Sequence, residues 1–202
     1  MFRIEPVSIN GFRNEDRNLI SHYVAKMNEV YKEREEEIKK QILAYNFTQT
    51  NETNEEIYKK YISGSERGSI SDGIWQLKVN AYWKRFSSAV AYTNVGSDEI
   101  NINMAKYNLK NEMSFIETLN HEYTHLAGLT HTFKYVSGRE HSAPYAIGKI
   151  LSKIYSDYWE MKESGEYVPE EPTPNKPVIV YRKSIFGQLK SIFLKFVRIF
   201  GT

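Results

Sequence analysis

The most informative stretch of the chain is His121-Glu122-Tyr123-Thr124-His125-Leu126-Ala127-Gly128-Leu129-Thr130-His131. It holds three of the five histidines in the chain. Apolar residues recur at helical spacing before and within it, which predicts a helix over residues 111–127. The stripe consists of Met113, Phe115, Ile116, Leu119, Tyr123 and Leu126. Because His121 and His125 are four residues apart, their imidazoles share one face of this helix, one turn apart.

The residue types in this stretch suit metal-assisted hydrolysis. Two imidazoles one turn apart can take two corners of a zinc tetrahedron, and the Glu122 carboxylate can reach a metal-bound water without ligating the metal. Gly128 stands where the helix would end, and glycine can take the left-handed turn that returns the chain. His131 can then supply the third nitrogen and leave the fourth position to water. The residues alone leave Glu140 and His141 open as third ligands.

The full pattern His-Glu-x-x-His-x-x-Gly-x-x-His resembles the signature of the metzincin clan of zinc peptidases, with all five fixed positions present. This resemblance implies one catalytic Zn²⁺ held by His121, His125 and His131, with Glu122 as general base and acid. Clan members place a methionine turn after the third histidine. Here the chain has Ser142-Ala143-Pro144-Tyr145, which resembles a Ser-x-Met-x-Tyr turn without its methionine. The resemblance gives Tyr145 the role of steadying the oxyanion beside the metal.

The expected fold is α+β: a metzincin-like small zinc peptidase domain over residues 1–163. We expect a twisted mixed sheet with an edge strand over the active-site cleft, and about three helices. Helical spacing predicts a long helix over residues 14–40, and alternation predicts a half-buried strand over 75–82. The remaining expected elements are a strand near 1–12, a short helix at 55–62, strands at 89–93 and 99–104 that form a hairpin, and a helix at 145–161.

The end of the chain differs in composition. Residues 164–177 hold four of the six prolines, which predicts a linker. Residues 178–202 are predicted to form a basic amphipathic helix, with no acid after residue 175. That helix suits packing on the domain or on another subunit, or contact with a membrane surface.

Composition excludes several classes. The net charge of +2 gives no electrostatic case for nucleic acid, and the absence of cysteine excludes disulfides and thiol ligands. No apolar run follows Met1, so we expect no signal peptide at this N-terminus. We expect a cytoplasmic protein if Met1 is native and a secreted one if the chain is a mature form. The sequence says nothing of the oligomeric state.

The expected function is a zinc-dependent endopeptidase that hydrolyses peptide bonds in protein or peptide substrates. The substrate would dock in extended form on the hairpin at residues 89–104. Two alternatives remain: a zinc-dependent amidase acting on cell-wall peptide, and a non-catalytic module that retains the fold and binds protein or membrane. The intact Glu122 favours catalysis over the second alternative.

Overall fold

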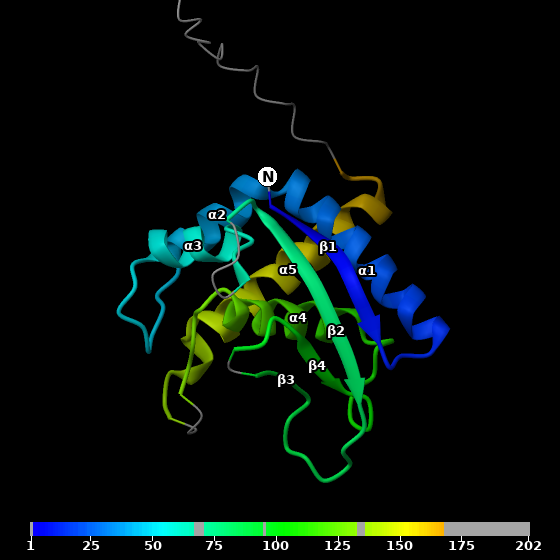
Figure 1. Ribbon diagram of the computed structural model, residues 1–202. Coiled ribbons are helices and arrows are strands. Elements are labelled where there is room, and N and C mark those ends of the chain that lie inside the picture. The colour runs from blue at the N-terminus through cyan, green and yellow to red at the C-terminus, as the bar shows by residue number, and fades with distance from the viewer. Residues whose placement is uncertain (1, 67–70, 95, 133–135, 168–202) are drawn as a thin grey trace, which may run out of the picture. The chain divides into compact units, whose positions relative to one another are not determined.

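The computed structural model describes residues 2–66, 71–94, 96–132 and 136–167, which form an α+β fold (Figure 1). Within them lie four strands, five α-helices and one short 3-10 helix. In chain order these are β1 (Arg3–Asn10), α1 (Asn14–Glu33), α2 (Glu35–Ala44), α3 (Asn54–Ile62), β2 (Ile74–Tyr82), β3 (Ala91–Thr93), β4 (Ile100–Asn103), α4 (Glu112–Leu126), η2 (Arg139–His141) and α5 (Ala143–Ser164).

The sheet is small and mixed, with the order β1-β2-β4-β3. Strands β1, β2 and β4 run parallel, whereas β3 is antiparallel to β4 and occupies one edge. Ala91 lies opposite Ile102, and Thr93 lies opposite Ile100. The predicted pairing of the segments near 89–93 and 99–104 is therefore confirmed, with shorter strands.

The core forms between the sheet and the helices that lie behind it in Figure 1. Along β2, Trp75, Leu77 and Val79 are fully buried, while the residues between them are not. The Trp75 ring stacks on Tyr123 of α4, with ring centroids 4.2 Å apart. This contact fixes the helix that carries the histidines against the sheet, and α5 packs along another side of the same helix.

The expectation of about three helices is wrong, because the described residues contain five. The long helix predicted over residues 14–40 ends at Glu33, and Arg34 leaves helical geometry with φ −126° and ψ 24°. The break redirects the chain so that Ile38 and Ile42 of α2 enter the core. The charged residues on either side of Arg34 suit a helix equally well, so the sequence carries no signal for this break.

The folded unit continues past residue 163. Helix α5 ends at Ser164, and Gly165 caps it with a φ of 76°. The Tyr167 hydroxyl donates a hydrogen bond to Glu33 at 3.1 Å, and its ring centroid lies 5.1 Å from that of Tyr158. The first four residues of the predicted linker thus belong to the folded unit.

The rest of the predicted linker, from residue 168, and the predicted helix at 178–202 lie outside the described residues. Among the helices that are described, none combines the length and the apolar composition that crossing a bilayer requires.

Candidate metal centre

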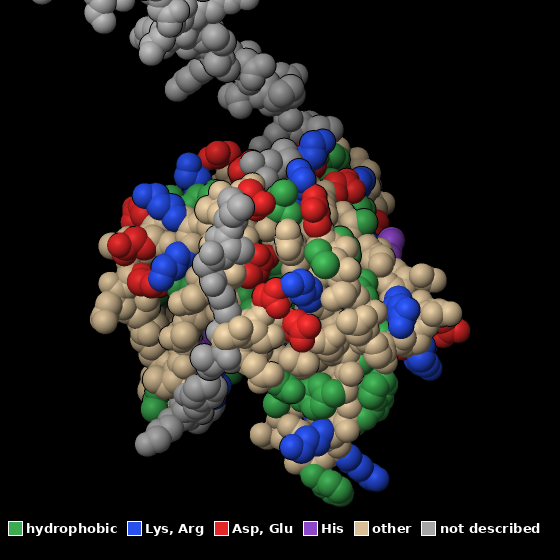
Figure 2. Space-filling view, viewed as in Figure 1, with side chains coloured by type: hydrophobic (Ala, Val, Ile, Leu, Met, Phe, Trp, Pro, Cys, Tyr) green, Lys and Arg blue, Asp and Glu red, His purple; other side chains and the backbone are tan. Residues whose placement is uncertain are grey.

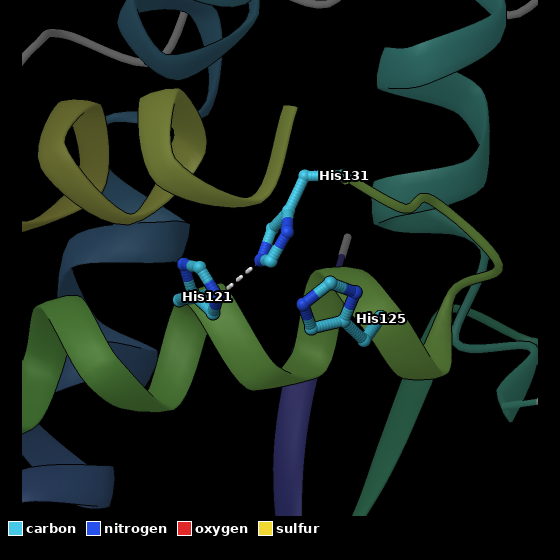
Figure 3. A group of neighbouring side chains, drawn as sticks. All are labelled: His121, His125 and His131. Atoms are coloured by element: carbon cyan, nitrogen blue, oxygen red, sulfur yellow. Dashed lines mark hydrogen bonds between the residues drawn. The ribbon is translucent and has the colours of Figure 1, made fainter. Parts of the chain in front are cut away.

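Helix α4 presents two histidines on one face (Figure 3). The ring centroids of His121 and His125 are 5.0 Å apart, as their four-residue spacing predicts. The helix begins after Asn111, whose side chain accepts a hydrogen bond from the Ser114 N–H at 3.1 Å. The helix has 15 residues, and its buried face packs in the core, which fixes the backbone that carries both rings.

The end of α4 turns the chain back as expected. Gly128 has a φ of 84°, and its N–H bonds the carbonyl of His125 at 3.1 Å. The Leu129 N–H bonds the carbonyl of Thr124 at 3.0 Å, which completes a Schellman motif. A Cβ at Gly128 would meet nothing within 4 Å, so the left-handed φ alone requires glycine here.

The returning chain brings His131 to the two helical histidines (Figure 3). The Nε2 atoms of His131 and His121 are 3.3 Å apart, and the rings of His131 and His125 have centroids 4.8 Å apart. One nitrogen from each of the three side chains lies within 4.8 Å of the others, so the group can hold a metal ion.

Neither alternative third ligand belongs to this group of described residues. His141 is exposed, and its Nδ1 lies 2.8 Å from the hydroxyl of Tyr45. The Glu140 carboxylate is also exposed and lies 4.0 Å from His141 Nε2.

Two backbone carbonyls orient the imidazoles. His125 Nδ1 lies 3.0 Å from the carbonyl oxygen of Leu129, and His131 Nδ1 lies 2.9 Å from that of Thr132. A carbonyl only accepts, so each Nδ1 carries the proton and each Nε2 keeps its lone pair. Such a bond from the far nitrogen is the usual support of a metal-bound histidine.

Burial favours the neutral form of His121 and His131. It lowers the pKa of His121 to about 3, with smaller contributions in the same direction from His125, His131 and Arg139. Burial is also the main cause that lowers the pKa of His131. Neutral imidazoles are the form that binds a metal, so protons compete weakly with it near neutral pH.

Glu122 lies on a different side of α4, toward the edge strand. The residue is only 6% exposed, and burial raises the pKa of its carboxyl to about 7. Hydrogen bonds with the side chain and backbone of Thr93 in β3 act in the opposite direction on this pKa. A carboxyl with a pKa near neutrality can accept a proton and return it.

Tyr145 reaches the histidines from the first turn of α5. Its ring centroid lies 4.4 Å from that of His121 and 4.9 Å from that of His131. The Arg139 guanidinium lies 5.1 Å from the centre of the same ring. Ser142 and Pro144 start the helix at this point, so the turn that lacks a methionine is the N-terminus of α5.

Gly148 is a positioning residue that the sequence interpretation missed. A Cβ there would lie 2.8 Å from the carbonyl oxygen of Glu117 and 3.5 Å from the Cβ of His121. Glycine therefore lets α5 approach α4 closely beside His121. A signal was present, because glycine inside a predicted helix costs about 1 kcal/mol relative to alanine and so indicates close packing.

A second missed feature is the segment 45–49, between α2 and α3. Gln49 has a positive φ of 60°, and its Oε1 lies 3.4 Å from the Thr132 N–H nitrogen and 3.3 Å from the Thr132 hydroxyl. The Thr48 N–H bonds the carbonyl of His141 at 3.0 Å. The segment thus supports the loop that carries His131. The contacting residues are far apart in the sequence, so no local pattern reveals these contacts.

Two surface cavities lie near the end of α4. One, of about 420 Å³, is lined by residues 49–52, 128–130 and Ala143. The other, of about 480 Å³, is lined by Leu126, Ala127 and Gly128 together with lysines and serines. The first adjoins the chain segment that leads to His131.

Comparison of the chain with models of protein families, with curated protein sequences and with solved structures finds no match in any of the three.

Proposed function

We propose that this protein is a zinc-dependent endopeptidase of the metzincin type, acting on protein or peptide substrates. The observation that carries the proposal is the convergence of His121, His125 and His131, with ligand atoms within 4.8 Å of one another. A catalytic zinc site takes three such protein ligands and keeps one position open. The donor set fits zinc, because imidazole nitrogen is among the ligands that zinc prefers in proteins.

The arrangement of the sheet supports a metzincin-like fold. The antiparallel edge strand β3 contacts α4, the helix that carries the first two ligands. An edge strand offers unpaired backbone groups, so an extended peptide can add to it as a further strand. Thr93 at the end of β3 also bonds the proposed base, Glu122, which links the substrate strand to the site of proton transfer.

The residues take distinct roles in the proposed reaction. Bound zinc would lower the pKa of a water molecule and polarise the scissile carbonyl. The Glu122 carboxylate accepts a proton from the attacking water and delivers it to the leaving amine. The Tyr145 hydroxyl donates a hydrogen bond to the oxyanion. The Leu129 and Thr132 carbonyls keep His125 and His131 in the tautomer that presents Nε2.

The proposal is tested with the zinc-loaded protein and a mixed library of peptides. Glu122→Gln is expected to keep its zinc and to lose hydrolysis by about a thousandfold, because it removes the proton acceptor. Glu117→Gln, earlier on the same helix, is the matched control and is expected to hydrolyse as the wild type does. Equal rates in Glu122→Gln and wild type contradict the mechanism. Cleavage of cell-wall peptide without cleavage of the library would support the amidase instead.

A further inference from the structure

The loop between β2 and β3, residues 83–90, exposes large apolar side chains. Phe86 is 95% exposed, Trp83 62% and Val90 43%. Single exposed apolar residues are ordinary, but aromatic rings grouped on one projecting loop indicate an interaction surface. We call this loop, residues 83–90, the aromatic loop.

All charged side chains of the aromatic loop are basic. Lys84 and Arg85 are exposed between the two aromatic residues, and no Asp or Glu occurs in residues 83–97. Figure 2 shows hydrophobic and basic side chains together on the part of the surface that projects beyond β2, with no acidic side chain among them on this face. The surface therefore suits a partner that is apolar and negatively charged.

The loop is held in shape from below. Asn103, which is fully buried, accepts a hydrogen bond from the Lys84 N–H at 3.0 Å. Its amide donates to the carbonyls of Lys84 and Ala89 at 2.8 and 3.2 Å. The Ser87 N–H bonds the Lys84 carbonyl at 3.2 Å. The aromatic side chains are thus held outward by ordered backbone, and little ordering cost remains for binding.

The shape and charge of the aromatic loop indicate which kind of partner it suits. The aromatic loop lines neither of the two cavities near α4, and its exposed rings suit contact with the surface of a partner. A second copy of the chain that docked through the same loop would bring like charges together. The segment 176–202 of this chain is also basic and free of acids, so it is repelled in the same way. An anionic, deformable surface meets both requirements.

We propose that the aromatic loop binds the surface of a membrane that contains anionic lipid. Trp83 and Phe86 enter the interfacial region, where amphipathic and aromatic rings are favoured. Lys84 and Arg85 contact the anionic headgroups. The binding does not involve the metal centre, so it is expected equally of the zinc-free protein.

The test measures co-sedimentation of the full chain with vesicles of phosphatidylcholine, with and without phosphatidylserine. The double variant Lys84→Ala/Arg85→Ala is expected to bind the anionic vesicles about 25-fold more weakly, at about fivefold for each basic residue. Phe86→Ser is expected to lose about tenfold on the same vesicles. Lys39→Ala/Lys40→Ala on α2 and Val7→Ser, at a residue 55% exposed on β1, are the matched controls.

A second readout reports the loop itself. Tryptophan emission is expected to shift to the blue when anionic vesicles are added to the wild type or to Trp159→Phe, and not when they are added to Trp83→Phe. Loop variants that bind as the wild type does overturn the proposal, since binding would then lie elsewhere in the chain. Unchanged vesicle binding with a raised KM for soluble peptides would also overturn it, and would assign the loop to the substrate.

Discussion

Two of the three candidate ligands lie on a helix, whereas the third lies on a loop, and different parts of the chain hold them. His121 and His125 are placed by the geometry of α4, which stacks on the sheet through Tyr123 and Trp75. His131 is placed by the glycine turn at Gly128 and by contacts from residues 45–49, more than 80 residues earlier. The positions of His121 and His125 therefore follow from local helix geometry, whereas the position of His131 depends on tertiary contacts.

Because the two regions differ in this way, the site can be weakened at the loop without unfolding the protein. If the proposed centre binds zinc, the loss of His121 or His125 is expected to abolish binding. A change in the support of the loop is expected only to lower the zinc affinity, through the position of His131. Residues that support ligands without touching the metal contribute about 10- to 100-fold in affinity in known metal sites. The two regions therefore predict losses of different size.

The largest effect is expected for His125→Ala. A site with two nitrogens and no replacement should bind zinc more weakly by a factor of about a thousand or more, and lose the stability that metal binding adds. His141→Ala is the matched control, because His141 is exposed and bonds Tyr45 outside the group. Competition with a chelator measures both. Equal losses in the two variants would contradict the assignment of ligands.

Gly128→Ala is expected to come next. The left-handed φ of 84° costs alanine about 1 kcal/mol, and any relaxation of the turn moves His131. Gly165→Ala separates the two effects, because Gly165 caps α5 with a φ of 76° and a Cβ there would likewise meet nothing within 4 Å. Chemical denaturation should show similar losses of stability. Zinc affinity should fall about tenfold in Gly128→Ala alone.

Gln49→Ala tests the support of the loop that carries His131. Without the Gln49 side chain, the Thr132 N–H and hydroxyl lose this acceptor, and the carbonyl of the same residue, Thr132, is the group that orients His131. Zinc affinity should fall about tenfold, with helix content unchanged. Gln41→Ala on α2, whose side chain bonds only Glu37 among the hydrogen bonds described, is the control. A wild-type affinity in Gln49→Ala would show that the Gly128 turn suffices to place the third ligand.

A further prediction concerns the pH dependence of stability in the zinc-free protein. The pKa of His121 is lowered from its ordinary 6.5 to about 3, so the unfolded chain binds a proton there first. His121 therefore costs stability as pH falls below 6.5. Glu122, with its pKa raised to about 7, acts in the opposite direction as pH falls from 7 to its ordinary 4.5.

The two contributions are separated by substitution. Between pH 6.5 and 5, wild type should lose stability relative to His121→Asn, by at most about 1.4 kcal/mol per pH unit. His22→Asn, at an exposed position on α1, should follow the wild type. Urea denaturation of the zinc-free proteins at several pH values measures the difference. A His121→Asn curve parallel to that of the wild type would show that burial does not keep this imidazole neutral.

The elements that could be predicted from the sequence are those whose position is set by one local pattern of apolar residues. The stripe around His121 placed α4 within one residue at each end, and alternation around Trp75 placed β2. The edge pairing of β3 and β4 followed from turn residues between two short apolar runs. These elements bury one face, so the period of the apolar residues carries the information.

The rest depends on contacts between distant segments. No residue near Arg34 in the sequence distinguishes a bent helix from a straight one. The bend depends on the packing of Ile38 and Ile42 in the core, which is a tertiary contact. The support of Thr132 by Gln49 joins residues 83 apart. The raised pKa of Glu122 depends on burial beside β3, which composition does not reveal.

The three-histidine centre is tested by the zinc content of the purified full chain, measured for wild type beside His131→Ala after zinc is supplied and the excess removed. We expect one zinc ion per chain in the wild type, and its loss or marked weakening in the variant, because His121 and His125 alone form an incomplete site. Zinc retained equally by both proteins, or bound by neither, would contradict the three-histidine centre.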